Sequence, residues 1–154
     1  MRADALPQLG ERAPDDLEKN LATPEEARQF VEETGVDVLA PAVGNMHGML
    51  TSMVHGEAAK HLDIDRIAAI KQAVNVPMTL HGGSGTDDND FRRAIKSGMT
   101  IVHVNTELRL AWRRGLEASL QAHPGEVAPY KIFPPVVSEI RKVVEARLRL
   151  FNGN

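Results

Sequence analysis

The 154-residue sequence contains no cysteine, no long apolar run and no block of basic residues. The absence of cysteine excludes disulfide bonds and thiolate metal sites, and it is consistent with a reducing compartment. The first residues lack the apolar stretch of a signal peptide, and no segment has the length needed to span a bilayer. The net charge is −3 and no basic stripe is present, which argues against a nucleic-acid partner. We therefore expect a cytoplasmic protein that binds neither membranes nor nucleic acid.

The residues that are present are typical of a globular domain. Apolar residues make up 42% of the chain, and charged residues of both signs make up 25%. A chain of this length can bury a hydrophobic core of ordinary size. Residues 1–22 are polar and irregular, whereas residues 23–154 carry the periodic patterns of a folded domain.

Several helices have recognisable start signals. Thr23-Pro24-Glu25-Glu26 combines an N-cap threonine, a proline at the first position and the glutamate of a capping box. Ala27, Phe30 and Val31 follow at the spacing of an apolar helix face. Gly35 then provides an end signal. Similar patterns predict helices from Asp63 to about Val74, from the acids at 87–90 to Ser97, from Thr106 as N-cap through Leu120, and over 136–151 after a linker at 124–135.

Three apolar runs, at 36–44, 76–80 and 99–105, are typical of buried strands. They are apolar nearly throughout rather than alternating, which suits parallel strands that are covered on both faces. Helices separate the runs, so parallel pairing through right-handed crossovers is expected. Three strands leave two open edges, and the predicted α/β arrangement therefore resembles part of a larger sheet.

Polar residues follow each predicted strand, at 44–48, 81–85 and 103–107. Ligands bind at the carboxyl ends of parallel strands, so the three clusters should converge. His47 and His81 could donate imidazole nitrogens to a divalent metal, with zinc the favoured ion. The alternative is that each histidine is a loop residue that makes ordinary hydrogen bonds.

The segment Gly82-Gly83-Ser84-Gly85 offers successive backbone N–H groups and a hydroxyl, directly before a predicted helix. Such a combination binds phosphate. Asn105 and Thr106 add polar groups at the start of the next helix, and phosphate sites formed after the last two strands recur in (β/α)8 barrels. The alternative is a flexible turn between a strand and a helix.

Three segments, 23–48, 80–98 and 102–112, together resemble the C-terminal half of the class II, metal-dependent ketose-bisphosphate aldolases. Members of this family cleave fructose 1,6-bisphosphate or tagatose 1,6-bisphosphate, releasing dihydroxyacetone phosphate and glyceraldehyde 3-phosphate. The resemblance implies a (β/α)8 TIM barrel in which the three predicted strands are the sixth, seventh and eighth. A full barrel needs about 250 residues, so this chain would be its C-terminal portion.

The resemblance also implies site residues and a cofactor. His47 and His81 match two zinc-binding histidines. The positions that match the phosphate site for dihydroxyacetone phosphate are Gly48, Gly82, Gly83 and Ser84, and a second substrate-contacting segment matches His103, Val104, Asn105 and Thr106. The implied reaction is a reversible retro-aldol cleavage, in which Zn2+ polarises the ketone oxygen in place of a lysine Schiff base.

Two departures from the family pattern bear on function. The acid/base aspartate and an adjacent zinc-binding histidine of the family belong to the N-terminal half of the barrel and have no counterpart here, so the catalytic residue is unknown. The family usually has asparagine where this chain has His103. One alternative is that His103 completes a three-histidine metal site with His47 and His81.

We therefore expect a class II aldolase fragment that is inactive alone and acts as a homo-oligomer or with a complementing N-terminal half. Two other hypotheses remain open. The chain could be a non-catalytic remnant or subunit-interaction module that binds metal and a sugar phosphate. It could also belong to a metal-independent barrel enzyme with a phosphorylated substrate. The sequence does not distinguish fructose from tagatose bisphosphate.

Overall fold

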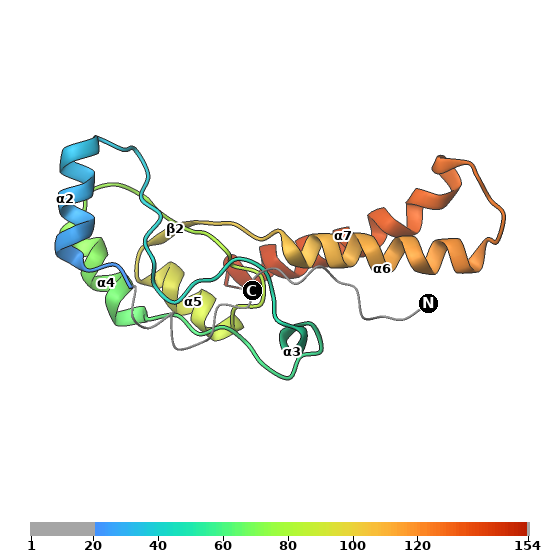
Figure 1. Ribbon diagram of the computed structural model, residues 1–154, viewed down its shortest axis with the longest axis horizontal. Helices are drawn as coiled ribbons and strands as arrows, with labels where there is room; N and C mark the ends of the chain where they lie inside the picture. Colours follow the sequence, from blue (N-terminus) through green and yellow to red (C-terminus); the bar gives the residue numbers. More distant parts are fainter. Residues whose placement is uncertain (1–20, 154) are drawn as a thin grey trace.

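The computed structural model describes residues 21–153, which form a mixed α/β unit (Figure 1). In chain order the elements are α2 (Pro24–Thr34), α3 (Thr51–Val54), α4 (Ile64–Ala73), β1 (Met78–Leu80), α5 (Asp88–Lys96), β2 (Met99–Val102), α6 (Thr106–Ala122) and α7 (Pro129–Phe151). The predicted irregular segment at 1–22 lies outside the described residues, except for its last two positions. Within residues 21–153, no helix combines the length and the apolar character that crossing a membrane requires.

Strand β1 lies between two parallel neighbours. Met78 pairs with Met99 of β2 on one side and forms an isolated parallel bridge with Leu39 on the other. The Leu39 N–H donates to the Pro77 carbonyl at 3.0 Å, and the Leu39 carbonyl accepts from the Thr79 N–H at 2.9 Å. All three segments therefore run in the same direction, as predicted.

The predicted strand at 36–44 is wrong in its extent, because only Leu39 in this run forms a β-bridge. Pro41 has no N–H with which to continue the ladder. Gly44 has a φ of 95°, which turns the backbone out of the extended conformation. The other two predicted strands are confirmed in shorter form as β1 and β2.

The start signals of the first three predicted helices are confirmed. Thr23 and Glu26 form a complete capping box at α2, and Gly35 ends this helix with a φ of 65°. Asp63 caps α4 by accepting from the backbone N–H of the third residue after it. Asp87 caps α5 in the same way, so the acids after the glycine-rich segment do begin a helix.

Two features near the predicted strand ends differ from expectation. Asn105, and not Thr106, occupies the N-cap position of α6, and Thr106 is the first residue of the helix. The short helix α3 was not predicted, because its N-cap residue, Leu50, offers no side-chain hydrogen bond and leaves no start signal in the sequence.

Helices α6 and α7 run antiparallel as a long hairpin that projects from the rest of the unit (Figure 1). Since α7 begins at Pro129, the predicted linker at 124–135 is wrong over its second half, and the prolines at 134–135 lie inside the helix. Packing against α6 stabilises the part of α7 that contains these prolines. Gly115 of α6 approaches Val136 so closely that an added Cβ would lie 2.8 Å from the Val136 Cα.

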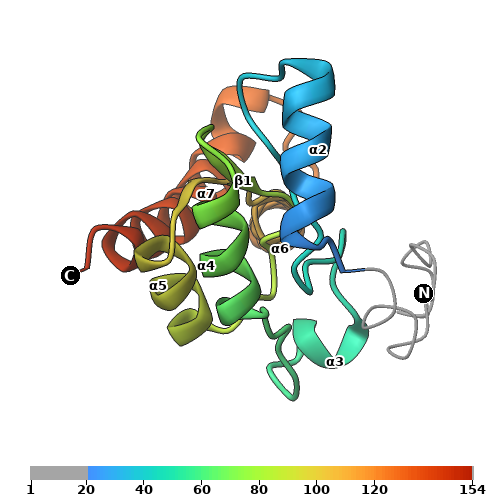
Figure 2. The same cartoon turned by 90° about the vertical axis from the view of Figure 1, so that its left-hand side faces the viewer.

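The hydrophobic core lies between the strands and helices α2, α4 and α5, which stand side by side in Figure 2. Phe91 of α5 is fully buried, and its ring contacts that of Phe151 at the end of α7, with centroids 5.2 Å apart. Ala27 is buried as predicted. Phe30, predicted on the same buried face, is 50% exposed. The buried face of α2 is therefore narrower than the spacing of its apolar residues indicates.

Replacing Phe91 with alanine is expected to lower the free energy of unfolding by about 3–5 kcal/mol, because it leaves a large cavity in the core. Phe30→Ala is the matched control and should cost less than about 1 kcal/mol, because this side chain is half exposed. Urea unfolding midpoints of the two variants provide the comparison. Equal losses would contradict the assignment of the core.

Candidate functional site

The segments that follow the parallel strands converge on one edge of the sheet, as predicted. There they surround a pocket of about 610 Å³. Its lining contains every predicted site residue except Gly83, together with Val102 and Arg109, which were not predicted: His47, Gly48, His81, Gly82, Ser84, Val102, His103, Val104, Asn105, Thr106 and Arg109. The pocket therefore joins loops from three separate parts of the chain.

Two glycines bring the backbones of these loops into contact. Gly82 has a φ of 64°, and a Cβ on it would lie 2.4 Å from the Met46 carbonyl oxygen. A Cβ on Gly83 would lie 2.9 Å from the His103 carbonyl oxygen, to which the Gly83 N–H donates at 3.0 Å. Any side chain at either position would push the loop after His81 away from its neighbours.

The imidazoles of the three predicted site histidines lie in a row. Ring centroids of His47 and His81 are 5.8 Å apart, and those of His81 and His103 are 4.5 Å apart. The Nδ1 atoms of His81 and His103 are 3.5 Å apart. Asn45 supports this arrangement, because its Nδ2 donates to the His81 carbonyl at 3.1 Å.

The donor set fits zinc only in part. Imidazole nitrogen is a preferred zinc ligand, and His47 and His81 present two such groups at one pocket. Within residues 21–153, however, no three or more His, Asp or Glu side chains are grouped so that they could hold a metal ion. The alternative three-histidine site with His103 is therefore not formed in this structure.

Two of the backbone amides in the glycine-rich segment donate hydrogen bonds to neighbouring parts of the protein. The Gly83 N–H donates to a backbone carbonyl, and the Gly85 N–H donates to Oε1 of Glu107 at 2.9 Å. The N–H groups of Gly82 and Ser84 have no hydrogen-bond partner in the described part of the chain, and both residues line the pocket. These two amides are the ones available to an anion.

The Ser84 side chain is buried and caps α6 from outside the helix. It is 2% exposed, and its Oγ accepts from the N–H groups of Asn105 at 3.1 Å and Glu107 at 3.4 Å. Asn105 itself makes no side-chain hydrogen bond as N-cap. A hydroxyl that accepts twice retains one O–H donor, and this donor is the group that remains for a bound anion.

Lys60 places a buried cation behind the pocket. The residue is only 5% exposed, and its Nζ donates, at 2.6 to 3.0 Å, to the carbonyl oxygens of Met46, Gly48, Gly82 and Ser84. Burial lowers the pKa of Lys60 to about 8, and the negative charge of Glu107 acts in the opposite direction. The side chain is therefore mostly protonated at neutral pH.

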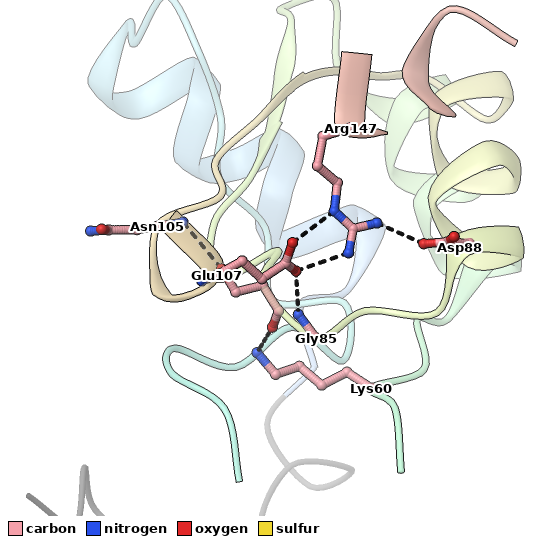
Figure 3. Close-up of polar contacts among 7 residues, drawn as sticks. Lys60, Gly85, Asp88, Asn105, Glu107 and Arg147 are labelled. Atoms are coloured by element: carbon pink, nitrogen blue, oxygen red, sulfur yellow. Dashed lines mark hydrogen bonds and ion pairs between the residues drawn. The ribbon is translucent and has the colours of Figure 1, made fainter. Parts of the chain in front are cut away.

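A second charged group ties the C-terminal helix to the glycine-rich segment (Figure 3). Arg147 of α7 donates from Nε and Nη2 to Glu107 at 2.8 and 3.0 Å, and from Nη1 to Asp88 at 2.6 Å. Burial disfavours the charge on Arg147, but the hydrogen bonds and charges of Glu107 and then Asp88 outweigh it and raise the pKa of the guanidinium. Glu107 thereby holds both Arg147 and the Gly85 amide.

Arg109 was missed although the sequence carries a signal for it. It lies one helical turn after Asn105, on the turn of α6 that faces the pocket. Lys60 and Arg147 were also missed, and no local pattern marks them, because their partners are distant in the sequence. The Lys60 acceptors lie 12 to 24 positions away, and the Arg147 acceptors lie 40 and 59 positions away.

The chain matches the family model for class II fructose-bisphosphate aldolase over residues 8–154. Its structure is similar to that of the YdjI aldolase from Escherichia coli K12, with a TM-score of 0.70 and 28% identity, over 86% of this chain and 46% of that one. It is also similar to the fructose-bisphosphate aldolase (Fba) from Campylobacter jejuni, with a TM-score of 0.68 and 19% identity, over 93% of this chain and 49% of that one. The second likeness concerns the fold alone, and the chain spans less than half the length of either structure.

Ser84→Ala is expected to lower the free energy of unfolding by about 0.5–2 kcal/mol, because two amides at the start of α6 lose their acceptor. Ser138→Ala, at an exposed position of α7, is the control and should have little effect. Urea unfolding compares the two variants. If Ser84→Ala is no less stable than Ser138→Ala, the hydroxyl does not cap α6.

Proposed function

Because this chain belongs to the class II fructose-bisphosphate aldolase family, we propose that it supplies the ketose-phosphate side of a zinc-dependent aldolase site. The observation that carries the proposal is the single pocket that gathers His47, His81 and the glycine-rich segment at the ends of parallel strands. A metal-binding edge and an anion-binding edge thus lie side by side. The substrate would be fructose 1,6-bisphosphate or tagatose 1,6-bisphosphate.

The two histidines are the proposed zinc ligands of this chain. His47 and His81 come from different loops, and Asn45 holds the backbone of the second. When bound, zinc supplies Lewis acidity that polarises the ketone oxygen of the substrate. We propose His103 as a substrate contact, because it lines the same pocket and its ring lies next to the His81 ring, with centroids 4.5 Å apart.

The phosphate of the dihydroxyacetone phosphate moiety is proposed to bind between the glycine-rich segment and the start of α6. The amides of Gly82 and Ser84 and the O–H of Ser84 are the proposed donors, since both residues line the pocket. The positive end of the α6 dipole also favours an anion there. Arg109, which also lines the pocket, adds a positive charge. The remaining substrate contacts proposed for this edge are Gly48, Gly83, Val104, Asn105 and Thr106.

For the fold, we propose that β1, β2 and the segment around Leu39 are consecutive strands of a (β/α)8 barrel. Two observations support this arrangement: the segments pair in parallel, and the pocket lies at the carboxyl ends of the strands, where barrel enzymes have their active sites. The matched aldolase structures are about twice as long as this chain. We therefore propose that the acid/base group and the remaining strands come from a complementing N-terminal half.

Zinc titrated into the purified chain is expected to bind, and His47→Ala and His81→Ala should each weaken this binding by at least about tenfold. Tenfold is the smallest loss typical of groups that merely support a metal ligand. His123→Ala is the control, because this histidine follows the far end of α6. Isothermal titration calorimetry measures all three variants. Unchanged affinity in both site variants would favour a metal-independent function.

The purified chain is expected not to cleave fructose or tagatose 1,6-bisphosphate, with or without zinc, because general acid–base chemistry requires a group that this chain is proposed not to supply. A coupled assay for dihydroxyacetone phosphate measures the reaction. Turnover by the chain alone would show that its own residues complete the catalytic site.

A further inference from the structure

The Lys60 ammonium occupies the space between the two loops that carry the proposed zinc ligands. Two of its acceptors, the carbonyls of Met46 and Gly48, flank His47 on either side in the chain. The other two belong to Gly82, which directly follows His81, and to Ser84. One cation therefore holds the backbone on both sides of the gap that separates the two imidazoles.

We propose that Lys60 is a positioning residue, whose ammonium clamps the His47 loop against the His81 loop and so sets the spacing of the two imidazoles. The proposal rests on the proposed function only in taking these histidines as metal ligands. The contacts of Lys60 would set this spacing whether or not the two histidines bind a metal.

The charge is essential to this arrangement. An ammonium has three N–H donors, whereas four carbonyl oxygens surround Nζ, so the oxygens cannot all be satisfied by separate linear hydrogen bonds. They act instead as a ring of dipoles around a compact positive charge. Without that charge, four oxygens directed at one point repel one another, and the two loops would separate.

Lys60 is itself anchored by its backbone, so the clamp has a fixed origin. Its N–H donates to the Gly85 carbonyl at 2.8 Å, and its carbonyl accepts from the Asp87 N–H at 3.0 Å. These bonds form a parallel bridge between Lys60 and Thr86. Figure 3 shows Lys60 and Arg147 on opposite sides of Gly85 and Glu107, which places the glycine-rich segment between two cations.

The contacts predict a selective effect on two neighbouring ring pairs. The His47–His81 pair spans the clamp, with centroids 5.8 Å apart. The His81–His103 pair, at 4.5 Å, does not span it, because His103 is held to Gly83 by a backbone hydrogen bond. Loss of the clamp should therefore separate the first pair and leave the second in contact.

The experiment uses proton NMR cross-relaxation between histidine rings in the full chain without metal. In Lys60→Ala, the His47–His81 cross-peak is expected to disappear while the His81–His103 cross-peak remains. Retention of both cross-peaks would overturn the proposal. Loss of both would also overturn it, because a residue that only stabilises the fold would affect the two pairs together. Lys71→Ala is the control, because Lys71 also donates to a backbone carbonyl, that of Val76, but on α4.

Chemical rescue tests whether the charge and its donors are what the loops require. Ammonium chloride is expected to restore the His47–His81 cross-peak in Lys60→Ala, because the ammonium ion can enter the vacated ring of oxygens. Tetramethylammonium chloride, with the same charge but no N–H, should not restore it. Equal recovery with both salts, or recovery with neither, would overturn the proposed clamp.

A second variant keeps the test decisive if Lys60→Ala does not fold. Lys60→Met preserves most of the buried aliphatic chain but carries no charge, so it should lose the same cross-peak and resist rescue by ammonium. A retained cross-peak in Lys60→Met would overturn the proposal. Zinc affinity of Lys60→Met should fall by about 10- to 100-fold. If wild-type chain binds no zinc, the proposed metal site fails, whereas the cross-relaxation result still decides the role of Lys60.

Discussion

The parallel pairing of β1 with a neighbour on each side is the constraint on which the rest of the structure depends. Met78 is fully buried and pairs with Leu39 and with Met99. Because the three segments run in one direction, the loops that leave them emerge at one edge. Residues that lie more than fifty positions apart in the chain, such as His47 and His103, thereby line one pocket.

Convergence alone would not hold three loops at fixed distances, since two of them carry glycines and none has many apolar side chains. Buried charge supplies the missing constraint. Lys60 gathers carbonyl oxygens from two loops, while Glu107, which is paired with Arg147, accepts from the Gly85 N–H on the other side. Buried groups of this kind are costly unless they are fully paired. The same pairing therefore makes the loops rigid before any ligand arrives, which reduces the entropy lost on binding.

The sequence predicts the helices of this fold better than its strands. Thr23, Asp63 and Asp87 mark helix starts because capping depends on residues three positions apart. The strand at 36–44 was overestimated because apolar character does not reveal whether a partner backbone is present along the whole run. The start of α7 at Pro129 was missed because contacts with α6 override the poor helix propensity of its prolines.

The same distinction applies to the candidate site. His81, Gly82 and Ser84 could be recognised because they are consecutive and follow an apolar run. Lys60 could not, since its acceptors are backbone oxygens on loops far away in the sequence, and a carbonyl carries no residue identity. The fold must be known before such a contact can be inferred.

The glycine-rich segment shows why composition does not assign the role of each residue. Its glycines serve contact as well as conformation, because Gly82 touches Met46 and Gly83 touches the His103 backbone. Alternate amides are used within the protein, and those between them remain for a ligand. A phosphate cradle built this way is held by the protein through one set of amides and would hold its anion through the other.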